Sequence, residues 1–377
     1  MQALLKANAS LIGVGLSAFV LMGAGQSLYG PALPVFSRSF GIGLGTAGLL
    51  ISAHWIGCAL AVAVLYFHAA TIGPRHAVGL MVVGSVILAL GPMWWMVLLG
   101  GLVFGIGYGA STVVFNPRIL QAFGLRGPAM VSLLNATFGL GAICAPLIFV
   151  ALGSRPNLVF GLVAVFGLLI WLLSGRTNGV DSAVPLKTHQ VFKPDFVLLG
   201  FGAVAIGIEA TLTGLGPTAL IAAGQTEVGA AELLSMFFLG FLVVRLILIA
   251  TAHLVPPFAL LAASFLCGAV AALLAALISP AVGFVALGPC AGLFFPSFFV
   301  ACSTMMGSDP RVSPTIIGAG LVGGISMPLF FSPILPHLGQ RGFFWAMACL
   351  LAVLALAALA KLSRLRHLSQ STLPAKS

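Results

Sequence analysis

One acidic side chain, Glu209, stands deep inside an apolar stretch of this 377-residue chain, where it could bind a proton or a cation. The other five carboxylates fall in or beside loops: Asp181, Asp195, Glu227, Glu232 and Asp309. An ionisable group inside a long apolar helix is costly to bury, and it usually faces a cavity or a partner. We therefore expect Glu209 to bind a proton or cation. The alternative is a structural glutamate hydrogen-bonded to its neighbours.

The basic residue inside an apolar run is Arg245. At about 1.5 Å per residue, Glu209 lies about 20 Å along its helix from Phe196. Arg245 lies on a helix that runs the other way, at a different depth, so a direct ion pair would need tilted or broken helices. We expect Arg245 to contact an anionic substrate or a cavity. The alternative is a structural role, in which the apolar part of the side chain is buried and the guanidinium reaches the membrane surface.

Uncharged polar residues gather in three further apolar runs. The segment Gly25–Pro31 combines residues that loosen a helix with polar side chains, and a loosened helix exposes backbone groups that can bind a solute. Ordinary hydrogen bonds between helices are the alternative. For His54, a neutral ring satisfied by a neighbour is favoured over a proton relay. The expected substrate-binding residues are Gln26, Tyr29, Tyr108, Thr112, Asn116, Asn135 and Arg245.

The elements that must position these residues are long apolar helices. The chain is 60% hydrophobic and 6% charged, with a mean hydropathy of +1.20, whereas a soluble domain is about 25% charged. Because a spanning helix needs about 20 apolar residues, the composition predicts an all-α integral membrane protein. The predicted spans are 10–34, 45–68, 77–95, 97–121, 128–152, 157–175, 196–223, 230–252, 256–278, 280–305, 314–337 and 341–362.

The basic residues mark one side of the membrane. Twelve Lys and Arg residues fall on the side of both termini, against Arg38, Arg155 and Arg341 on the other side. This bias predicts a multi-pass protein of the cell inner membrane with both termini in the cytoplasm. The net charge of +10 is thus a topology signal, and we expect a lipid bilayer rather than a nucleic acid as its partner.

The twelve spans divide into two similar halves. We expect an N-terminal six-helix bundle in residues 1–175, a cytoplasmic linker in 176–195, and a C-terminal six-helix bundle with a cytoplasmic tail in 196–377. Matching residues recur at an offset of 182 or 183, which predicts two pseudo-symmetric bundles. The pairs are Gly105 with Gly288, Gly109 with Gly292, Gly141 with Gly323, and Pro146 with Pro328.

No pattern in the chain predicts a cofactor, a metal or an enzyme. The six cysteines lie in apolar runs without CxxC spacing, which favours packing residues, with a soft-metal pathway as the alternative. The glycine run near Gly105 lacks the βαβ context of a dinucleotide site. There is neither a Walker sequence nor a Ser-His-Asp or paired-carboxylate arrangement.

Several motifs resemble those of the major facilitator superfamily, and in particular its fucose-permease-like sugar branch. The run Gly105–Asn116 resembles the GxGxGxxDxxxN pattern of that branch, and Phe237–Arg245 resembles its FxxGxxxGR pattern. Further similar segments are Ser132–Ala142 with Pro146, and Gly207–Glu209 with Gly216-Pro217-Thr218. The resemblance implies twelve helices in two bundles, a cavity lined by spans one, four, seven and ten, and transport by alternating access.

The chain also departs from the family patterns. Thr112 and Asn135 stand where the branch has Asp and His, and Ala70 stands at the Asp of the loop signature between spans two and three. We expect a monomeric secondary transporter of a small polar or anionic metabolite, coupled through Glu209 to a proton or cation. Efflux of an amphipathic or toxic compound is one alternative. A non-transporting assembly factor or sensor with the same fold is the other.

Overall fold

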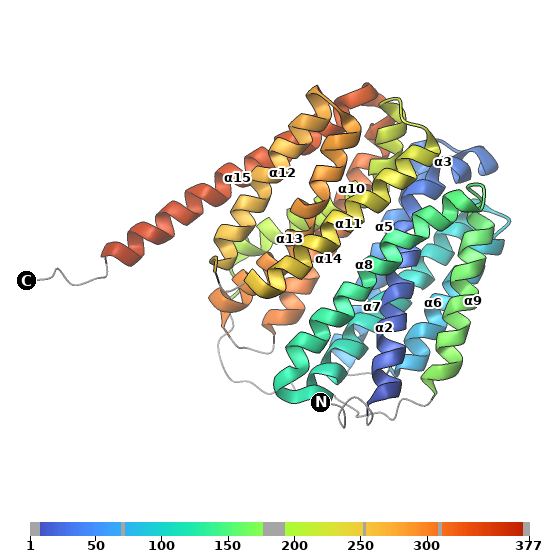
Figure 1. Cartoon of the computed structure of the whole chain (residues 1–377), viewed down its shortest axis with the longest axis horizontal. Helices are drawn as coiled ribbons and strands as arrows, with labels where there is room; N and C mark the ends of the chain where they lie inside the picture. Colours follow the sequence, from blue (N-terminus) through green and yellow to red (C-terminus); the bar gives the residue numbers. More distant parts are fainter. Residues whose placement is uncertain (1–7, 69–71, 176–192, 252–253, 308–310, 372–377) are drawn as a thin grey trace, which may run out of the picture.

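A computed structural model describes residues 8–68, 72–175, 193–251, 254–307 and 311–371, and these residues form helices without a β-strand (Figure 1). The first group of helices is α2 (Ala9–Ser27), α3 (Tyr29–Phe40), α4 (Leu44–Ala47), α5 (Leu49–His68), α6 (Pro74–Leu90), α7 (Trp94–Phe123), α8 (Gly127–Ala151) and α9 (Pro156–Ser174). The second group is α10 (Phe196–Ala222), α11 (Glu227–Thr251), α12 (Pro257–Leu277), α13 (Pro280–Met306), α14 (Val312–Ile334) and α15 (Gly339–Ser371).

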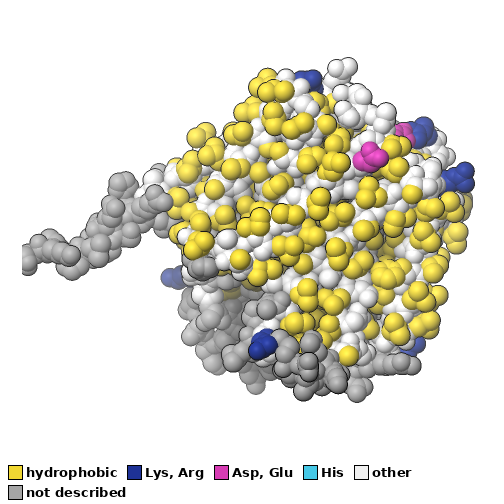
Figure 2. Space-filling view, viewed as in Figure 1, with side chains coloured by type: hydrophobic (Ala, Val, Ile, Leu, Met, Phe, Trp, Pro, Cys, Tyr) yellow, Lys and Arg dark blue, Asp and Glu magenta, His cyan; other side chains and the backbone are white. Residues whose placement is uncertain are grey.

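The predicted spans are confirmed. Within the described residues, eleven helices are long and apolar enough to cross a membrane, and α6 adds a shorter apolar helix of 17 residues. The helical hydrogen-bond pattern of the first span is interrupted at Leu28, between α2 and α3, inside the segment where the sequence predicts a loosened helix. The backbone angles of Leu28 stay helical, and Pro31 has no N–H to donate to the Ser27 carbonyl oxygen. The exterior is apolar, as a lipid-facing surface must be. Figure 2 shows hydrophobic side chains over the visible face, with charged side chains toward its two ends.

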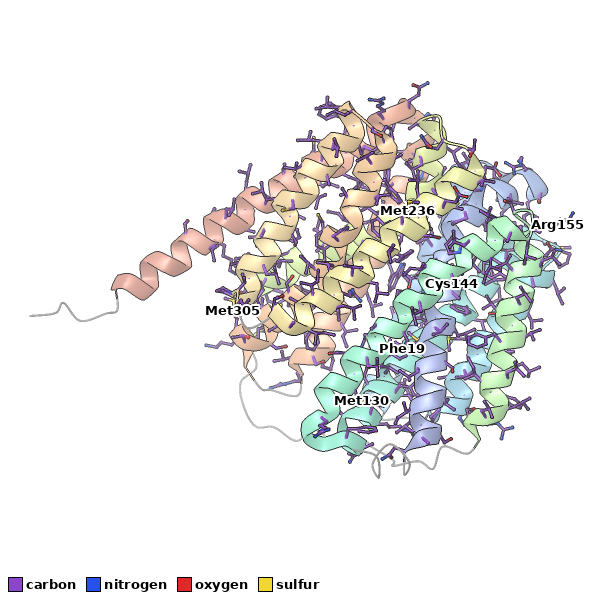
Figure 3. The ribbon with its side chains drawn as sticks, in the orientation of Figure 1. Phe19, Met130, Cys144, Arg155, Met236 and Met305 are labelled. Atoms are coloured by element: carbon purple, nitrogen blue, oxygen red, sulfur yellow. The ribbon has the colours of Figure 1, made fainter. Side chains whose placement is uncertain are left out.

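The two ends of the molecule carry different groups. We call the end at which α9 stops and α10 starts the linker end, and the opposite end, where Arg38 meets Glu227, the ion-pair end. Arg155 lies near the ion-pair end and Met130 near the linker end (Figure 3). Most of the predicted linker, residues 176–192, lies outside the described residues, so the domain boundaries stay a prediction.

The predicted internal repeat reappears in the contacts of the glycines. A side chain at Gly105 would strike the carbonyl oxygen of His54, and one at its counterpart Gly288 would strike the carbonyl oxygen of Phe237. His54 and Phe237 are themselves 183 residues apart. Likewise, a side chain at Gly109 would strike the carbonyl oxygen of Cys58, and one at Gly292 that of Phe241. A side chain at Gly141 would strike the carbonyl oxygen of Val20, and one at Gly323 that of Ala203. The offset in the sequence therefore marks equivalent helix contacts in two pseudo-symmetric bundles.

The bundles meet along α8 with α11 and along α5 with α14. Figure 3 labels one residue on each member of the first pair, Cys144 on α8 and Met236 on α11. Near mid-height, Trp55 of α5 lies against Gly324 of α14, and Leu242 of α11 lies against Gly139 of α8. Side chains on these faces can therefore act together across the interface.

The interface is tightly closed toward the ion-pair end. A side chain at Gly30 would meet the carbonyl oxygens of Thr213 and Gly214 at 2.8 and 3.0 Å, and one at Gly45 would meet the carbonyl oxygen of Ser332 at 2.9 Å. Above these contacts, Arg38 of α3 forms a bidentate ion pair with Glu227 of α11, with Nη2 to Oε2 at 3.0 Å. Helices α3 and α4 of one bundle and α10, α11 and α14 of the other thus close this end.

The linker end has fewer close contacts at its glycines on three helices. A side chain added at Gly13 of α2, Gly200 of α10 or Gly318 of α14 would meet nothing within 4 Å. At this end Asp195 caps α10 by accepting a hydrogen bond from the Leu198 backbone N–H at 2.9 Å, and Lys361 of α15 donates to it at 2.8 Å. Partial burial raises the pKa of Asp195, but these two partners outweigh it and the pKa falls below its usual value.

Candidate functional site

Glu209 lies in the middle of α10, on a stretch that packs closely against α14. Gly207, one half-turn before it, leaves no room for a side chain because Met327 and the carbonyl oxygen of Gly323 lie against it. Glu209 Oε2 is buried, and within the described residues it has no hydrogen-bond partner. A buried carboxylate oxygen without a donor is costly, and a proton, a cation or a ligand at this position would relieve that cost.

Arg245 reaches from α11 toward Glu209. Its Nε donates a hydrogen bond to the carbonyl oxygen of Gly292 on α13 at 3.0 Å, and its guanidinium lies 4.0 Å from the ring centroid of Phe241. Helical side chains point toward the N-terminus of their helix, and the N-terminus of α11 is at the ion-pair end. The side chain of Arg245 is therefore expected to extend toward the depth of Glu209.

Tyr108 of α7 faces this pair from the other bundle. The charges of Glu209 and Arg245 act on each other and on Tyr108 across the interface. Among the described residues, however, no ion pair within 4.0 Å joins Glu209 to Arg245. The expected site residues Tyr108, Glu209 and Arg245 thus lie within electrostatic range of one another without an ion pair between them.

Aromatic rings surround Tyr108. Its ring makes edge-to-face contacts with His54, Trp55 and Phe138, at centroid distances of 5.0, 6.1 and 6.4 Å. Trp55 and Phe138 are partly exposed at mid-height. Neither residue was among those expected from the sequence, because an aromatic residue in an apolar span is ordinarily a packing residue.

Tyr29 and His54 form a buried pair behind this aromatic group. Tyr29 is 1% exposed, and its hydroxyl is hydrogen-bonded to His54 Nδ1 at 3.2 Å. On the other side of the ring, Cys58 Sγ lies 3.7 Å from Nε2. Both ring nitrogens therefore have partners, as expected for a neutral structural histidine. Tyr29 does not reach the group of Tyr108, Glu209 and Arg245 directly.

The remaining expected residues fall into two classes. Gln26 Oε1 and Asn116 Oδ1 are buried and lack a hydrogen-bond partner within the described residues, so both can accept a donor from a ligand. In contrast, Thr112 donates to the Gly109 carbonyl oxygen at 2.7 Å, and Asn135 donates to the Val131 carbonyl oxygen at 2.8 Å. Each of these two hydrogen bonds stays within its own helix, α7 for Thr112 and α8 for Asn135.

A separate cavity of about 450 Å³ lies at the ion-pair end. It lies between the two bundles, and its walls include Arg38, Glu227, Thr218 and Gln340. Glu209, Arg245 and Tyr108 are not among its lining residues. The close contacts around Gly30 and Gly45 therefore seal this cavity from the group at mid-height.

The arrangement of two helical bundles around ionisable groups at mid-height agrees with the sequence comparison. The sequence profile of the Major Facilitator Superfamily matches residues 15–319. The chain belongs to the major facilitator superfamily. No curated protein sequence matches it significantly.

Solved structures of superfamily members share the fold at low sequence identity. The peptide transporter POT superposes with a TM-score of 0.78 at 12% identity, covering 94% of this chain and 94% of that chain. The nucleoside transporter NupG superposes with 0.72 at 14% identity, covering 94% and 98%. The E. coli fucose:proton symporter FucP superposes with 0.60 at 17% identity, covering 92% and 97%. Likeness at this identity supports the fold alone.

Proposed function

We propose that this superfamily member is a secondary active transporter that moves a small polar or anionic metabolite, sugar-like or an organic acid, across the cell inner membrane by alternating access. The observation that carries the proposal is the Glu209 carboxylate, which has an unpartnered oxygen and meets Arg245 and Tyr108 where the two bundles face each other. A merely structural glutamate would be expected to have partners for both oxygens.

Two further observations support a small polar solute. The unpartnered oxygens of Gln26 and Asn116 would accept hydrogen bonds from hydroxyl or amide groups of a ligand. The solved relatives named above carry peptides, nucleosides or fucose according to their descriptions. We assign the coupling proton or cation to Glu209, and we expect the transporter to act as a monomer.

The orientation follows from the sorting of basic side chains. Arg38, Arg155 and Arg341 lie at the ion-pair end, whereas Lys361 lies at the linker end, as does Arg75, which stacks on Trp171 at 4.2 Å. Under the positive-inside rule the linker end faces the cytoplasm. We infer that the closed ion-pair end faces outward, and that the cavity near Arg38 is the outer entrance.

The test separates exchange from coupling. Purified protein in proteoliposomes is assayed for counterflow with labelled sugars, nucleosides and organic acids, because counterflow needs alternating access but no ion gradient. Glu209→Gln is then compared with the unchanged protein in gradient-driven uptake and in counterflow of the same compound. We expect Glu209→Gln to exchange the compound and to lose accumulation by at least about tenfold, because the amide cannot take up a proton.

Glu232→Gln is the matched control, because it removes a carboxylate near the start of α11 at the ion-pair end, away from the proposed site. It should leave both activities unchanged. Full accumulation by Glu209→Gln would contradict coupling through Glu209. No exchange of any compound by the unchanged protein would favour the non-transporting alternative.

Efflux of an amphipathic compound is the second candidate function. The partly exposed rings of Trp55, Tyr108 and Phe138 at mid-height favour it, since they offer apolar contact beside the charged pair. Inside-out vesicles distinguish the two. Proton-driven uptake of a lipophilic organic cation into such vesicles, with no exchange of polar metabolites, would support efflux.

A further inference from the structure

The guanidinium of Arg245 is held in place by a carbonyl group that a proline sets free. In a regular helix the carbonyl oxygen of Gly292 would accept a hydrogen bond from the backbone N–H of residue 296. That residue is Pro296, inside α13, and proline has no N–H to donate. The freed oxygen instead accepts from Arg245 Nε at 3.0 Å. Pro296 is therefore a positioning residue for Arg245.

Two other features fix the orientation of the guanidinium. A side chain at Gly292 would meet the Phe241 carbonyl oxygen and Val244 Cγ1, each at 2.7 Å, so this glycine is what lets α13 approach α11. The ring of Phe241, one helical turn before Arg245, lies 4.0 Å from the guanidinium carbon. With one face on a ring and Nε bonded, the group has lost most of its rotational freedom before any ligand arrives.

The two Nη groups of Arg245 are the free side of this arrangement. Within the described residues, neither Nη donates a hydrogen bond, and no carboxylate oxygen lies within 4.0 Å of either. A planar pair of N–H donors matches the two oxygens of one carboxylate. A half-buried cation without a bonded anion also favours an anionic ligand, because the ligand would supply the missing partner.

We propose that the Nη pair of Arg245 is a carboxylate-binding subsite, and that the substrate is a small monocarboxylate taken up together with one proton on Glu209. This inference rests on the proposed transport function and names its substrate class. The charge count gives the reason. One bound carboxylate neutralises the charge of Arg245. An ionised Glu209 would then be an excess buried negative charge, which protonation removes. Binding of the carboxylate therefore strengthens binding of the proton, and the reverse.

The groups around Glu209 allow such coupling. Of the helices packed against α10, α14 carries no ionisable residue. The ionisable residues of the others include Arg38 of α3, Cys290 and Cys302 of α13, and Lys361 of α15, and none of these acts on the charge of Glu209. Among the described residues, Arg245 of α11 acts electrostatically on Glu209, and Tyr108 of α7 interacts with both. Loss of the free Arg245 charge on carboxylate binding is therefore the main change that Glu209 experiences.

The first test is binding to the purified full-length protein. The probes are lactate and benzoate, each compared with its primary amide, together with glycine as a zwitterion and glucose as a neutral sugar. We expect thermal stabilisation by a carboxylate and none by its amide, with about one proton taken up per carboxylate when calorimetry is repeated in buffers of different ionisation enthalpy. Binding of glycine without proton uptake, or of glucose alone, would overturn the proposal.

The second test uses variants around Arg245. Arg245→Lys keeps the charge but loses the pair of donors, and we expect it to raise the Kd of the carboxylate by at least about tenfold. Pro296→Ala returns an N–H to the Gly292 carbonyl oxygen and should raise the Kd several-fold while the unliganded protein keeps its melting temperature. Pro117→Ala, at an exposed proline within α7, is the matched control and should leave the Kd unchanged.

The outcomes separate this inference from the transport function. Counterflow of a sugar or nucleoside without binding of any carboxylate would leave the transporter standing and would overturn the carboxylate subsite. Absence of counterflow for every compound would instead contradict transport itself. Equal affinities of Arg245→Lys and the unchanged protein would likewise overturn the subsite, provided that both variants purify as folded protein.

Discussion

At the scale of single residues, Glu209 has a buried oxygen without a hydrogen-bond partner among the described residues, and Arg245 donates a hydrogen bond to the Gly292 carbonyl oxygen. Glu209 was singled out by its depth in a span, and it proves to have an unpartnered oxygen at the bundle interface. The depth estimate placed Glu209 and Arg245 apart, and the described residues indeed show no ion pair between them within 4.0 Å. That estimate counted backbone positions and did not include the direction of the long arginine side chain. Two spacings in the sequence could have indicated the direction of the arginine side chain. Phe241 lies one helical turn before Arg245, and Pro296 lies four residues after Gly292.

Two tyrosines offer a prediction at this scale. Tyr29→Phe removes the hydroxyl that is bonded to His54 and leaves a buried ring nitrogen unpaired, so we expect the free energy of unfolding to fall by about 1–3 kcal/mol. Ligand affinity should stay the same, because Tyr29 is 1% exposed. Thermal melts and ligand titrations in detergent measure the two effects.

The matched change is Tyr108→Phe, which removes the same hydroxyl from the ring that faces Glu209 and Arg245. It should weaken ligand binding with a smaller effect on the melt. The result that would contradict this division is a Tyr29→Phe protein with a normal melting temperature and a clearly altered ligand affinity. Tyr29 would then belong to the binding site, as the polar run in span one led us to expect.

At the scale of helices, the sequence predicted most of the fold. Apolar runs located the twelve spans, and the loosened segment Gly25–Pro31 located the interruption at Leu28. The repeat of 183 residues worked because equivalent helix crossings in the two bundles need the same glycine against the same carbonyl group. The extension of the first span to Phe40 was missed, since Ser37 and Arg38 interrupt the apolar run.

The repeat leads to a prediction about paired glycines. Gly105→Ala and Gly288→Ala each place a methyl group against a backbone carbonyl of the neighbouring helix, which cannot move aside as a flexible side chain can. We expect each variant to lose about 1–3 kcal/mol of unfolding free energy. The two losses should be similar because the contacts are equivalent. Thermal or denaturant unfolding in one detergent measures both.

Gly161→Ala on α9 is the control for this pair, since a side chain there would meet nothing within 4 Å. It should be neutral or stabilising by up to about 1 kcal/mol, because alanine favours the helix. If all three variants behaved alike, helix propensity rather than helix contact would explain the result. The glycine repeat would then lose its structural meaning.

At the scale of the whole molecule, the sequence gives no indication of which end of the interface is closed. Alternating access requires two arrangements of nearly equal free energy, and a sequence compatible with both cannot favour one by its helical pattern. The contacts that decide between them join residues far apart in the chain. Arg38 and Glu227 are the clearest example, since 189 positions separate them.

The last prediction follows from that ion pair. It joins α3 of one bundle to α11 of the other at the closed end, so the two residues must separate whenever that end opens. In the double variant Arg38→Cys with Glu227→Cys, a short bismaleimide should link the two sites and stop counterflow. The single variants, treated alike, should keep exchanging, which also controls for the native cysteines.

Modification of Arg38→Cys alone should be faster when the protein opens outward. A linked protein that still exchanged solute would show that this end need not open, and the rocking of the two bundles around Glu209 and Arg245 would have to be abandoned.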